Sequence, residues 1–241
     1  MDTVIGWLDS TNKRPSFVTL YFHEPDSAGH KDGLDAPQLA EAVKQVDNVV
    51  GRLVDDIQRL KLHDVVNLVI VSDHGMAELS PERVITLGDF TDMSKVQVDF
   101  SGPVTGLRPR DGNVDVLYAT LKAKEKHFRL YRREQMPERY HFRSNDRIPP
   151  LVLIADEGWF ITPRTAAEQA ERTLLKATHG FDPELESMGG LFIAQGAAFR
   201  RGVTIGPVEN VHVYNLLCAT LGLQPAANDG DNRLVKNVLA K

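Results

Sequence analysis

The sequence predicts an α/β fold with a mostly parallel central sheet, helices on both faces of that sheet and a small mixed insertion. Two observations predict it. Two apolar strand-like runs, residues 16–22 and 65–71, flank a stretch with helical spacing over residues 37–62, which makes a strand–helix–strand unit. Polar segments follow both runs directly, at the carboxyl ends where open parallel sheets gather their ligands.

The first part of the chain supplies the first strand and the long helix of this unit. Asp2 is suited to cap a short helix, and residues 16–22 (SFVTLYF) are typical of a buried strand. Residues 23–33 are polar and contain glycine, which predicts a loop. Residues 37–62 then repeat apolar side chains at helical spacing. These apolar positions are Leu39, Val43, Val46, Val50, Leu53, Ile57 and Leu60.

Residues 65–71 (VVNLVIV) form the clearest predicted strand. Only Asn67 interrupts the apolar run, as expected of a central parallel strand that is covered on both faces. Strand–helix–strand crossovers are right-handed and place their strands in a parallel sheet. We therefore expect residues 16–22 and 65–71 to lie in one parallel sheet.

The second half of the chain is less regular. Residues 80–150 contain alternating and turn-rich pieces, which predict a small mixed or antiparallel insertion within a single domain that spans residues 1–241. Strand character returns at residues 151–159, and a loop over residues 178–196 leads into a further apolar strand at residues 190–194. A late helix is predicted over residues 211–221.

Composition excludes several classes of protein. The chain has 241 residues, 42% of them hydrophobic and 25% charged, which is ordinary for a globular protein and excludes disordered, collagen-like and coiled-coil chains. The formal net charge of −5 argues against nucleic acid as a stable partner. No apolar run approaches the roughly 20 residues of a membrane span. The first ten residues lack the basic start and apolar core of an export signal.

The single cysteine, Cys218, excludes an intrachain disulfide and a cysteine-based zinc cluster. Its neighbours Leu216, Leu217 and Ala219 are apolar, which favours a buried structural thiol over a reactive one.

Three polar segments carry the residue types of a metal site. Asp26 and His30 are four positions apart, so one turn of backbone brings a carboxylate and an imidazole together. Asp73 and His74 follow the strand over residues 65–71, and adjacent strand side chains diverge, so they could serve two neighbouring ions. His179 lies in a third such segment. These oxygen and nitrogen ligands suit zinc or another divalent transition metal better than calcium.

A simpler interpretation applies to each segment on its own. An aspartate beside a histidine is commonly a surface ion pair, and His179 taken alone favours no ligand role. The placement of all three segments after apolar strands favours a shared site, in which two ions a few ångströms apart could clamp the oxygens of a phosphoryl displacement. The other histidines are predicted to be surface or packing residues. They are His23, His63, His127, His141 and His212.

An ordered set of short segments resembles the nucleotide pyrophosphatase/phosphodiesterases of the alkaline phosphatase superfamily, and the resemblance is close to their bacterial members. Any one segment is a weak signal, whereas the set in family order is a strong one. The segments are Tyr21-Phe22, Glu24-Pro25-Asp26, Gly29-His30, Ser72-Asp73-His74-Gly75-Met76, Met136-Pro137-Glu138-Arg139-Tyr140, Arg147-Ile148-Pro149, Glu157-Gly158-Trp159, His179-Gly180-Phe181-Asp182-Pro183, Val213-Tyr214-Asn215-Leu216 and Asn228-Asp229-Gly230.

The resemblance implies an alkaline-phosphatase-like sandwich, two zinc ions and a nucleotide substrate. One ion would be held by Asp26, His30 and His179. The other would be held by Asp73 and His74 together with a further aspartate. In the family a threonine attacks phosphorus and forms a covalent nucleotidyl-threonine, which water hydrolyses to release the nucleoside monophosphate.

Tyr21 occupies the family position whose aromatic ring stacks on the nucleobase. The implied location is periplasmic or extracellular.

The sequence departs from the family at the nucleophile. Neither Thr11, which precedes Asn12-Lys13, nor Asp2 has the surroundings of the family's threonine and of its further metal aspartate. The chain therefore resembles the C-terminal part of the catalytic domain, with one complete three-residue metal site and no identified catalytic nucleophile. We expect such a chain to bind a divalent metal but to hydrolyse nucleotide diesters very slowly or not at all.

Two other functions fit parts of the pattern. One is a phosphomonoesterase or mutase-like member of the same superfamily, although Tyr21 and the Glu24-Pro25-Asp26 segment favour the diesterase. The other is a non-catalytic metal-binding or interaction module.

Overall fold

The computed structural model describes residues 1–173 and 175–240, which divide into two compact units. The first unit comprises residues 1–25, 41–73 and 190–241, and the second comprises residues 26–40 and 74–189. Among the described residues no helix is long and apolar enough to cross a membrane.

The helices of the first unit begin with α1 (Asp2–Asp9) and most of the long helix α3 (Pro37–Arg59). Leu8 of α1 packs with Leu53 and Ile57 of α3, so the C-terminal part of the predicted apolar face is buried, whereas Val43 is 49% exposed. Asp2 does not cap α1, because the helix begins at Asp2 itself with Met1 as its N-cap. The Asp2 carboxylate instead pairs with Arg52 of α3.

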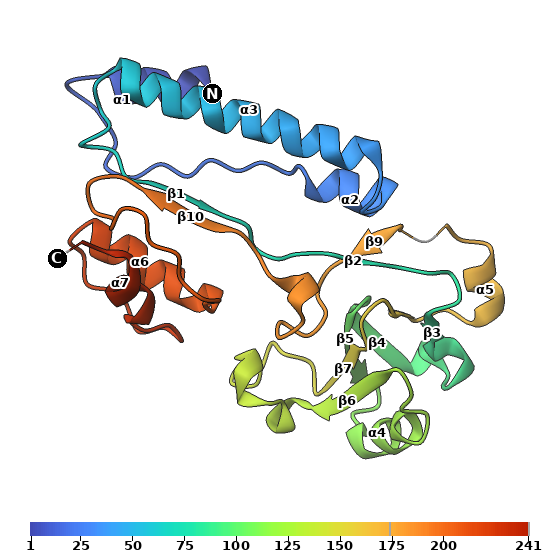
Figure 1. Cartoon of the computed structure of the whole chain (residues 1–241). Helices are drawn as coiled ribbons and strands as arrows, with labels where there is room; N and C mark the ends of the chain where they lie inside the picture. Colours follow the sequence, from blue (N-terminus) through green and yellow to red (C-terminus); the bar gives the residue numbers. More distant parts are fainter. Residues whose placement is uncertain (174, 241) are drawn as a thin grey trace. The chain divides into compact units, whose positions relative to one another are not determined.

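The strands of the first unit are β1 (Leu68–Val71) and β10 (Phe192–Gln195), which lie side by side (Figure 1). They pair antiparallel, with Leu68 opposite Gln195 and Val71 opposite Phe192. The expectation of a parallel strand covered on both faces is therefore wrong for β1, and Val71 is 47% exposed. The strand that pairs with β1 lies far from it in the sequence. The helical spacing over residues 37–62 therefore gives no indication of this pairing.

The predicted strand over residues 16–22 is absent from the structure. This segment forms an irregular connection between α1 and α2 (Figure 1), and its side chains Phe17 and Leu20 are 52% and 41% exposed. A strand exists only through hydrogen bonds to a neighbouring strand, and within residues 1–173 and 175–240 no neighbour pairs with this segment.

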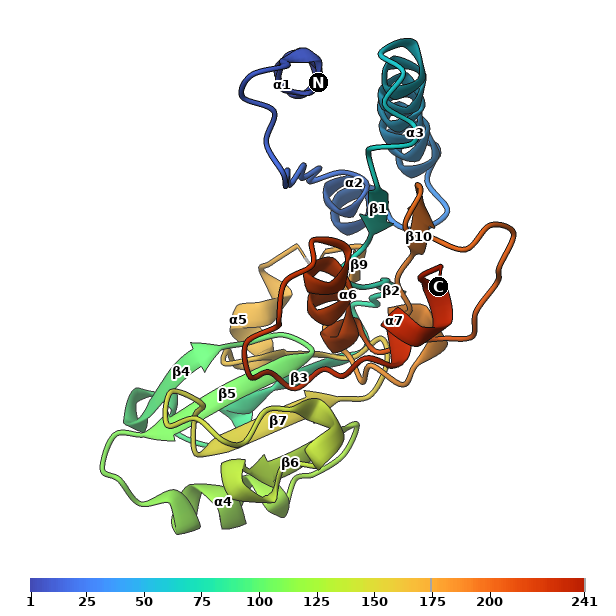
Figure 2. The same cartoon turned by 90° about the vertical axis from the view of Figure 1, so that its left-hand side faces the viewer.

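The C-terminal part of the first unit is helical. Helices α6 (Val213–Thr220) and α7 (Arg233–Val238) lie against one another, as Figures 1 and 2 show, and bury Leu216 and Leu234 together. Cys218 on α6 is 7% exposed and is a free cysteine, which confirms the prediction of a buried thiol.

The second unit centres on a four-stranded antiparallel sheet in the order β4–β5–β7–β6 (Figure 2). Three of its strands come from residues 80–150, and β7 follows that range, so whether residues 80–150 form an insertion stays a prediction. Its strands are β4 (Val96–Phe100), β5 (Val104–Pro109), β6 (Phe128–Arg132) and β7 (Leu151–Ala155).

Strand β7 is buried on both faces. Because side chains alternate along a strand, Leu151 and Leu153 face a core that includes Leu117 and Leu121 of α4 (Val114–Lys122). The intervening Val152 faces a second cluster with Met136 and Ile148.

Short elements complete the second unit. Strand β3 (Val84–Thr86) pairs in parallel with β8 (Phe160–Thr162), and β2 (Ala77–Glu78) pairs antiparallel with β9 (Ala177–Thr178). Two further helices are α2 (Asp26–Asp32) and α5 (Ala166–Ala170). The 3₁₀ turns of the chain are η1 (Leu87–Asp89), η2 (Met93–Lys95), η3 (Arg133–Gln135), η4 (Glu138–Tyr140), η5 (Glu186–Met188) and η6 (Asn210–His212).

Candidate metal centre

Helix α2 carries the first two side chains of the centre. The sequence predicts a loop over residues 23–33, but the structure has a helix from Asp26 to Asp32. Asp26 lies in the first turn, where the helix dipole favours a negative charge. The four-residue spacing places His30 one turn further on the same face, and its Nε2 lies 3.4 Å from Oδ1 of Asp26.

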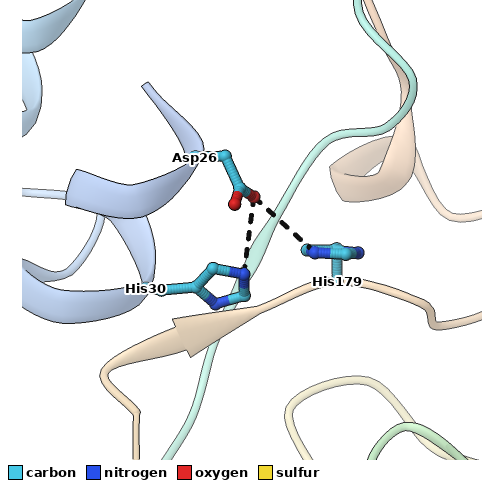
Figure 3. Close-up of side chains that lie close together, drawn as sticks. All are labelled: Asp26, His30 and His179. Carbon is cyan, nitrogen blue, oxygen red and sulfur yellow. Dashed lines mark ion pairs between the residues drawn. The ribbon is translucent and has the colours of Figure 1, made fainter. Parts of the chain in front are cut away.

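The third side chain comes from the end of β9. Pairing of β9 with β2 sets Thr178 opposite Ala77, and His179 follows directly after this short ladder. The Nε2 atom of His179 lies 3.6 Å from Oδ1 of Asp26 (Figure 3). One ligand atom from each of Asp26, His30 and His179 lies within 4.8 Å of the others, so the three residues form a group that could hold a metal ion.

A backbone carbonyl fixes the orientation of the His30 ring. The Nδ1 atom of His30 lies 2.8 Å from the carbonyl oxygen of Ala177 in β9. A carbonyl only accepts hydrogen bonds, so Nδ1 carries the proton and the neutral ring keeps its lone pair on Nε2. That lone pair belongs to the atom nearest Asp26, and hydrogen bonding of the opposite ring nitrogen is the usual support of a histidine metal ligand.

The Asp26 carboxylate meets a second requirement of a metal ligand. Its Oδ1 atom is buried and has no hydrogen-bond partner, although buried oxygens are normally satisfied. The contacts of 3.4 and 3.6 Å to the two Nε2 atoms exceed the usual hydrogen-bond length. They match the roughly 3.3–3.6 Å that separates two ligands of a tetrahedral zinc ion with bonds of about 2.0–2.2 Å. The three donors therefore fit a divalent metal.

His74 lies beside this group. Its ring stacks on that of His179 with centroids 3.5 Å apart and an interplanar angle of 13°. Its Nδ1 lies 2.8 Å from the carbonyl oxygen of Gly75, so the lone pair of the neutral ring is again on Nε2. Stacked rings direct their lone pairs in two separate planes, and His74 is not part of the three-residue group.

Two close backbone approaches hold the segments of the centre together. A Cβ added at Gly29 of α2 would lie 2.6 Å from Sδ of Met76, so the absence of a side chain lets the helix approach the segment that carries His74. A Cβ added at Gly75 would overlap the carbonyl oxygen of Ser187. The Gly75 amide uses this closeness to donate to the carbonyl of Met188 at 2.9 Å.

The other two predicted site residues, Tyr21 and Asp73, belong to the first unit. Tyr21 lies in the irregular segment after α1 and is 82% exposed. Asp73 is exposed and follows β1, two residues after the strand ends. The amide of neighbouring Ser72 donates to the carbonyl of Leu191, the residue before β10, at 3.0 Å. The roles of Tyr21 and Asp73 stay predictions.

A cluster near His179 had no role assigned to it from the sequence. Asp182 accepts hydrogen bonds from both Nη1 and Nη2 of Arg139, each at 2.5 Å, and from the Tyr140 hydroxyl at 2.9 Å. The Arg139 hydrogen bond is the main cause that lowers the pKa of Asp182 to about 2. Burial, with the carboxylate beside it, raises the pKa of Tyr140. In the sequence, the only indication of this cluster is that residues 136–140 and residues 179–183 both belong to the set of segments that resembles the family.

The remaining histidines lie at the surface or in packing contacts. His63 is exposed and lies 3.2 Å from Asp64, whereas buried His212 accepts from the amide of Asp231 at 3.0 Å. The His127 ring stacks on Trp159 at 3.8 Å. His23 and His141 are exposed.

Comparison with known proteins identifies the family. The family model described as type I phosphodiesterase/nucleotide pyrophosphatase matches residues 1–182. The chain belongs to this family. The resemblance inferred from the sequence motifs is therefore confirmed at the level of the family.

The sequence similarity to individual relatives extends over nearly the whole chain. Ectonucleotide pyrophosphatase/phosphodiesterase family member 7 of Mus musculus is 35% identical over 245 residues, which cover 99% of this chain and 54% of the relative. Bis(5'-adenosyl)-triphosphatase enpp4 of Xenopus laevis is 36% identical, with 98% and 51% covered. The chain thus spans about half the length of the curated relatives it matches.

Solved structures confirm the α/β fold class. Murine ectonucleotide pyrophosphatase/phosphodiesterase 5, an inactive variant in complex with AMP, superposes with a TM-score of 0.90 at 33% identity. The match covers 99% of this chain and 62% of that one. The human counterpart gives a TM-score of 0.91 at 31% identity, with 100% and 63% covered.

Proposed function

We propose that this chain takes part in the metal-dependent hydrolysis of nucleotide phosphodiester or pyrophosphate bonds, with release of a nucleoside monophosphate. Its relatives are named pyrophosphatases, phosphodiesterases and a triphosphatase, and one solved relative was captured with AMP. We further propose that the two compact units work together as one phosphodiesterase catalytic domain, in which residues 80–150 are an insertion.

One observation carries the proposal most directly. The buried Oδ1 atom of Asp26 lies between the Nε2 atoms of His30 and His179 without a hydrogen-bond partner. An ionised oxygen without a partner is costly to bury, so these residues are stable together when a cation binds them. Asp26, His30 and His179 would hold a zinc ion, which when bound supplies positive charge to the phosphoryl oxygens of a substrate.

A second ion is proposed next to the first. Because the His74 ring stacks on His179 instead of converging with it, His74 suits a neighbouring ion better than the same one. Two-metal sites place their ions about 3.5–4 Å apart, which is comparable to the stacking distance of 3.5 Å. Asp73 would be the carboxylate partner of His74 at this ion.

The substrate would be recognised by its base and by its phosphate. We propose that the Tyr21 ring stacks on the nucleobase, since it is 82% exposed and aromatic stacking is tolerant of base identity. The metal-binding side chains would hold the phosphate end through the bound ions.

Zinc-dependent binding of AMP tests this function. In isothermal titration we expect the chain with zinc to bind AMP, and we expect EDTA to abolish the binding. The control variant is His63→Ala, which removes an exposed histidine outside the centre and leaves AMP binding unchanged. His30→Ala is expected to abolish the zinc-dependent part. AMP binding that is equal with zinc and with EDTA contradicts the proposal.

We also propose a location outside the cytoplasm, either extracellular or periplasmic, because the curated relatives include proteins named ectonucleotide enzymes. Surface labelling and fractionation of the source cells check this. Recovery of the protein only with the cytoplasmic fraction contradicts it.

A further inference from the structure

Arg139, Tyr140 and Asp182 form a closed set of contacts in the second unit. The Arg139 guanidinium donates to both oxygens of Asp182, which is the strong bidentate arrangement of an arginine–carboxylate pair. The same guanidinium lies 4.2 Å from the centre of the Tyr140 ring, and the Tyr140 hydroxyl donates to Asp182. Each of the three side chains therefore contacts the other two.

Asp182 lies three residues after His179 on the same loop. Thr178, which directly precedes His179, is buried and paired with β2. Gly180 then turns the chain with φ of +96°, a conformation that favours glycine, and Phe181 is 4% exposed. The Asp182 carboxylate also accepts from the amide of Glu184 at 3.1 Å, which fixes the far side of the loop.

Of the two partners of Asp182, Tyr140 packs against the core. Arg139 and Tyr140 lie in the turn η4. Tyr140 packs against the cluster on one face of the antiparallel sheet, together with buried Met136 and Val152. The contacts to Asp182 thus connect the His179 loop to a rigid sheet.

We propose that Arg139, Tyr140 and Asp182 act as a positioning clamp that holds His179 in the arrangement that binds metal. The inference rests on the proposed function, since it needs the ion at Asp26, His30 and His179. The clamp residues are not members of the three-residue group that could hold the ion. They limit the motion of the backbone between β9 and Asp182, so the imidazole of His179 is preorganised next to Asp26.

The clamp should affect metal affinity more than folding. The Arg139 and Asp182 side chains are 36% and 29% exposed, so their ion pair is partly screened by water. Supporting residues around a metal site commonly change its affinity by about 10- to 100-fold when they are replaced. We expect Asp182→Asn to weaken zinc binding within this range.

The experiment measures zinc affinity by isothermal titration for the wild-type chain and for Asp182→Asn. Arg139→Lys keeps the charge but loses the bidentate geometry, and it should retain an intermediate affinity. The matched control is Asp115→Asn. Asp115 lies 2.6 Å from Arg132, and Arg132 lies 4.3 Å from the centre of the Tyr118 ring, so the control breaks a similar trio away from the His179 loop. We expect Asp115→Asn to bind zinc like the wild type.

A cobalt spectrum separates positioning from general stability. Cobalt(II) in place of zinc gives visible absorption bands that depend on ligand number and geometry. We expect the bands of Asp182→Asn to differ from those of the wild type, and those of Asp115→Asn to be unchanged. If Asp182→Asn does not fold, Tyr140→Phe carries the test, because it removes only the hydroxyl group, which donates to Asp182 and accepts from Arg139.

The outcomes are distinguishable. Equal zinc affinity and equal cobalt spectra in the wild type and the folded clamp variant overturn the clamp alone. A wild-type chain that binds no zinc overturns the proposed function, and the clamp with it.

Discussion

Oδ1 of Asp26 and Nε2 of His179 lie 3.6 Å apart, although one residue opens the second helix and the other follows a strand much later in the chain. The pair is brought together by helix α2, which presents Asp26, and by the β2–β9 ladder, which ends just before His179. This Oδ1 atom of Asp26 is buried and has no hydrogen-bond partner.

Base stacking by Tyr21 is the first prediction. Tyr21→Ala should weaken AMP binding to the zinc-loaded chain by about 1–3 kcal/mol, which is the usual loss of one stacked aromatic ring. Tyr21→Phe keeps the ring and should bind like the wild type. Titration calorimetry measures both, and Phe17→Ala is the matched control because Phe17 is an exposed aromatic in the same segment. Unchanged affinity of Tyr21→Ala would show that the ring has no contact with the base.

The pH dependence of stability follows from Asp182. Its pKa is lowered from 3.8 to about 2 in the folded chain, chiefly by Arg139. A carboxyl group whose pKa is lower in the folded chain than in the unfolded chain stabilises the fold at pH values above its unfolded pKa. This contribution to the free energy of unfolding is lost as the pH falls through the folded pKa. Nearly two pKa units correspond to roughly 2 kcal/mol.

The measurement is urea unfolding of the wild type and Asp182→Asn at pH 5 and pH 3. The difference between their free energies of unfolding should shrink by roughly 1 kcal/mol at the lower pH, since the unfolded carboxyl is then largely protonated. A difference that stays constant between these pH values would mean that the Asp182 pKa is not lowered.

Gly75 is predicted to be essential for local packing. In Gly75→Ala the new methyl group would overlap the Ser187 carbonyl oxygen and lie 2.8 Å from that of Gly189, so the backbone must shift. We expect a loss of about 1–3 kcal/mol in the free energy of unfolding, as for other overpacked sites. The control is Gly51→Ala in α3, where nothing lies within 4 Å and a gain of roughly 0.5–1 kcal/mol is expected. Equal effects of the two substitutions would contradict the packing argument.

The fourth prediction concerns turnover. The resemblance implies a threonine nucleophile for which we identify no counterpart in the sequence, so with zinc we expect the 241-residue chain to hydrolyse a chromogenic thymidine-monophosphate ester at well below about 1 per second. The assay compares this diester with nitrophenyl phosphate, and faster turnover of the monoester would favour a phosphomonoesterase. Diester turnover of about 1–1000 per second would be evidence against the prediction, and its loss in Thr11→Ala or Ser27→Ala would locate the nucleophile.

The sequence predicted those features that depend on neighbouring residues. The apolar spacing over residues 37–62 gave the long helix α3, which ends at Arg59, and the four-residue interval between Asp26 and His30 placed both side chains on one face. The apolar run at the start of residues 151–159 likewise predicted a strand, and β7 occupies Leu151–Ala155. The burial of β7 on both faces comes from two different clusters.

Features that depend on distant partners were predicted less well. The apolar run over residues 65–71 indicated a strand, but nothing in it shows that β1 pairs antiparallel with β10. The run over residues 16–22 has strand-like composition but gains no pairing partner in the part of the chain that the structure describes. Arg139 and Asp182 are 43 positions apart in the sequence, so no spacing rule reveals their contact.

The most direct test of the central claim is diffraction from crystals grown with zinc, recorded on both sides of the zinc absorption edge. We predict an anomalous peak about 2.0–2.2 Å from Oδ1 of Asp26 and from Nε2 of both His30 and His179. Ordered density for the three side chains without an anomalous peak between them would contradict the claim that they form a metal site.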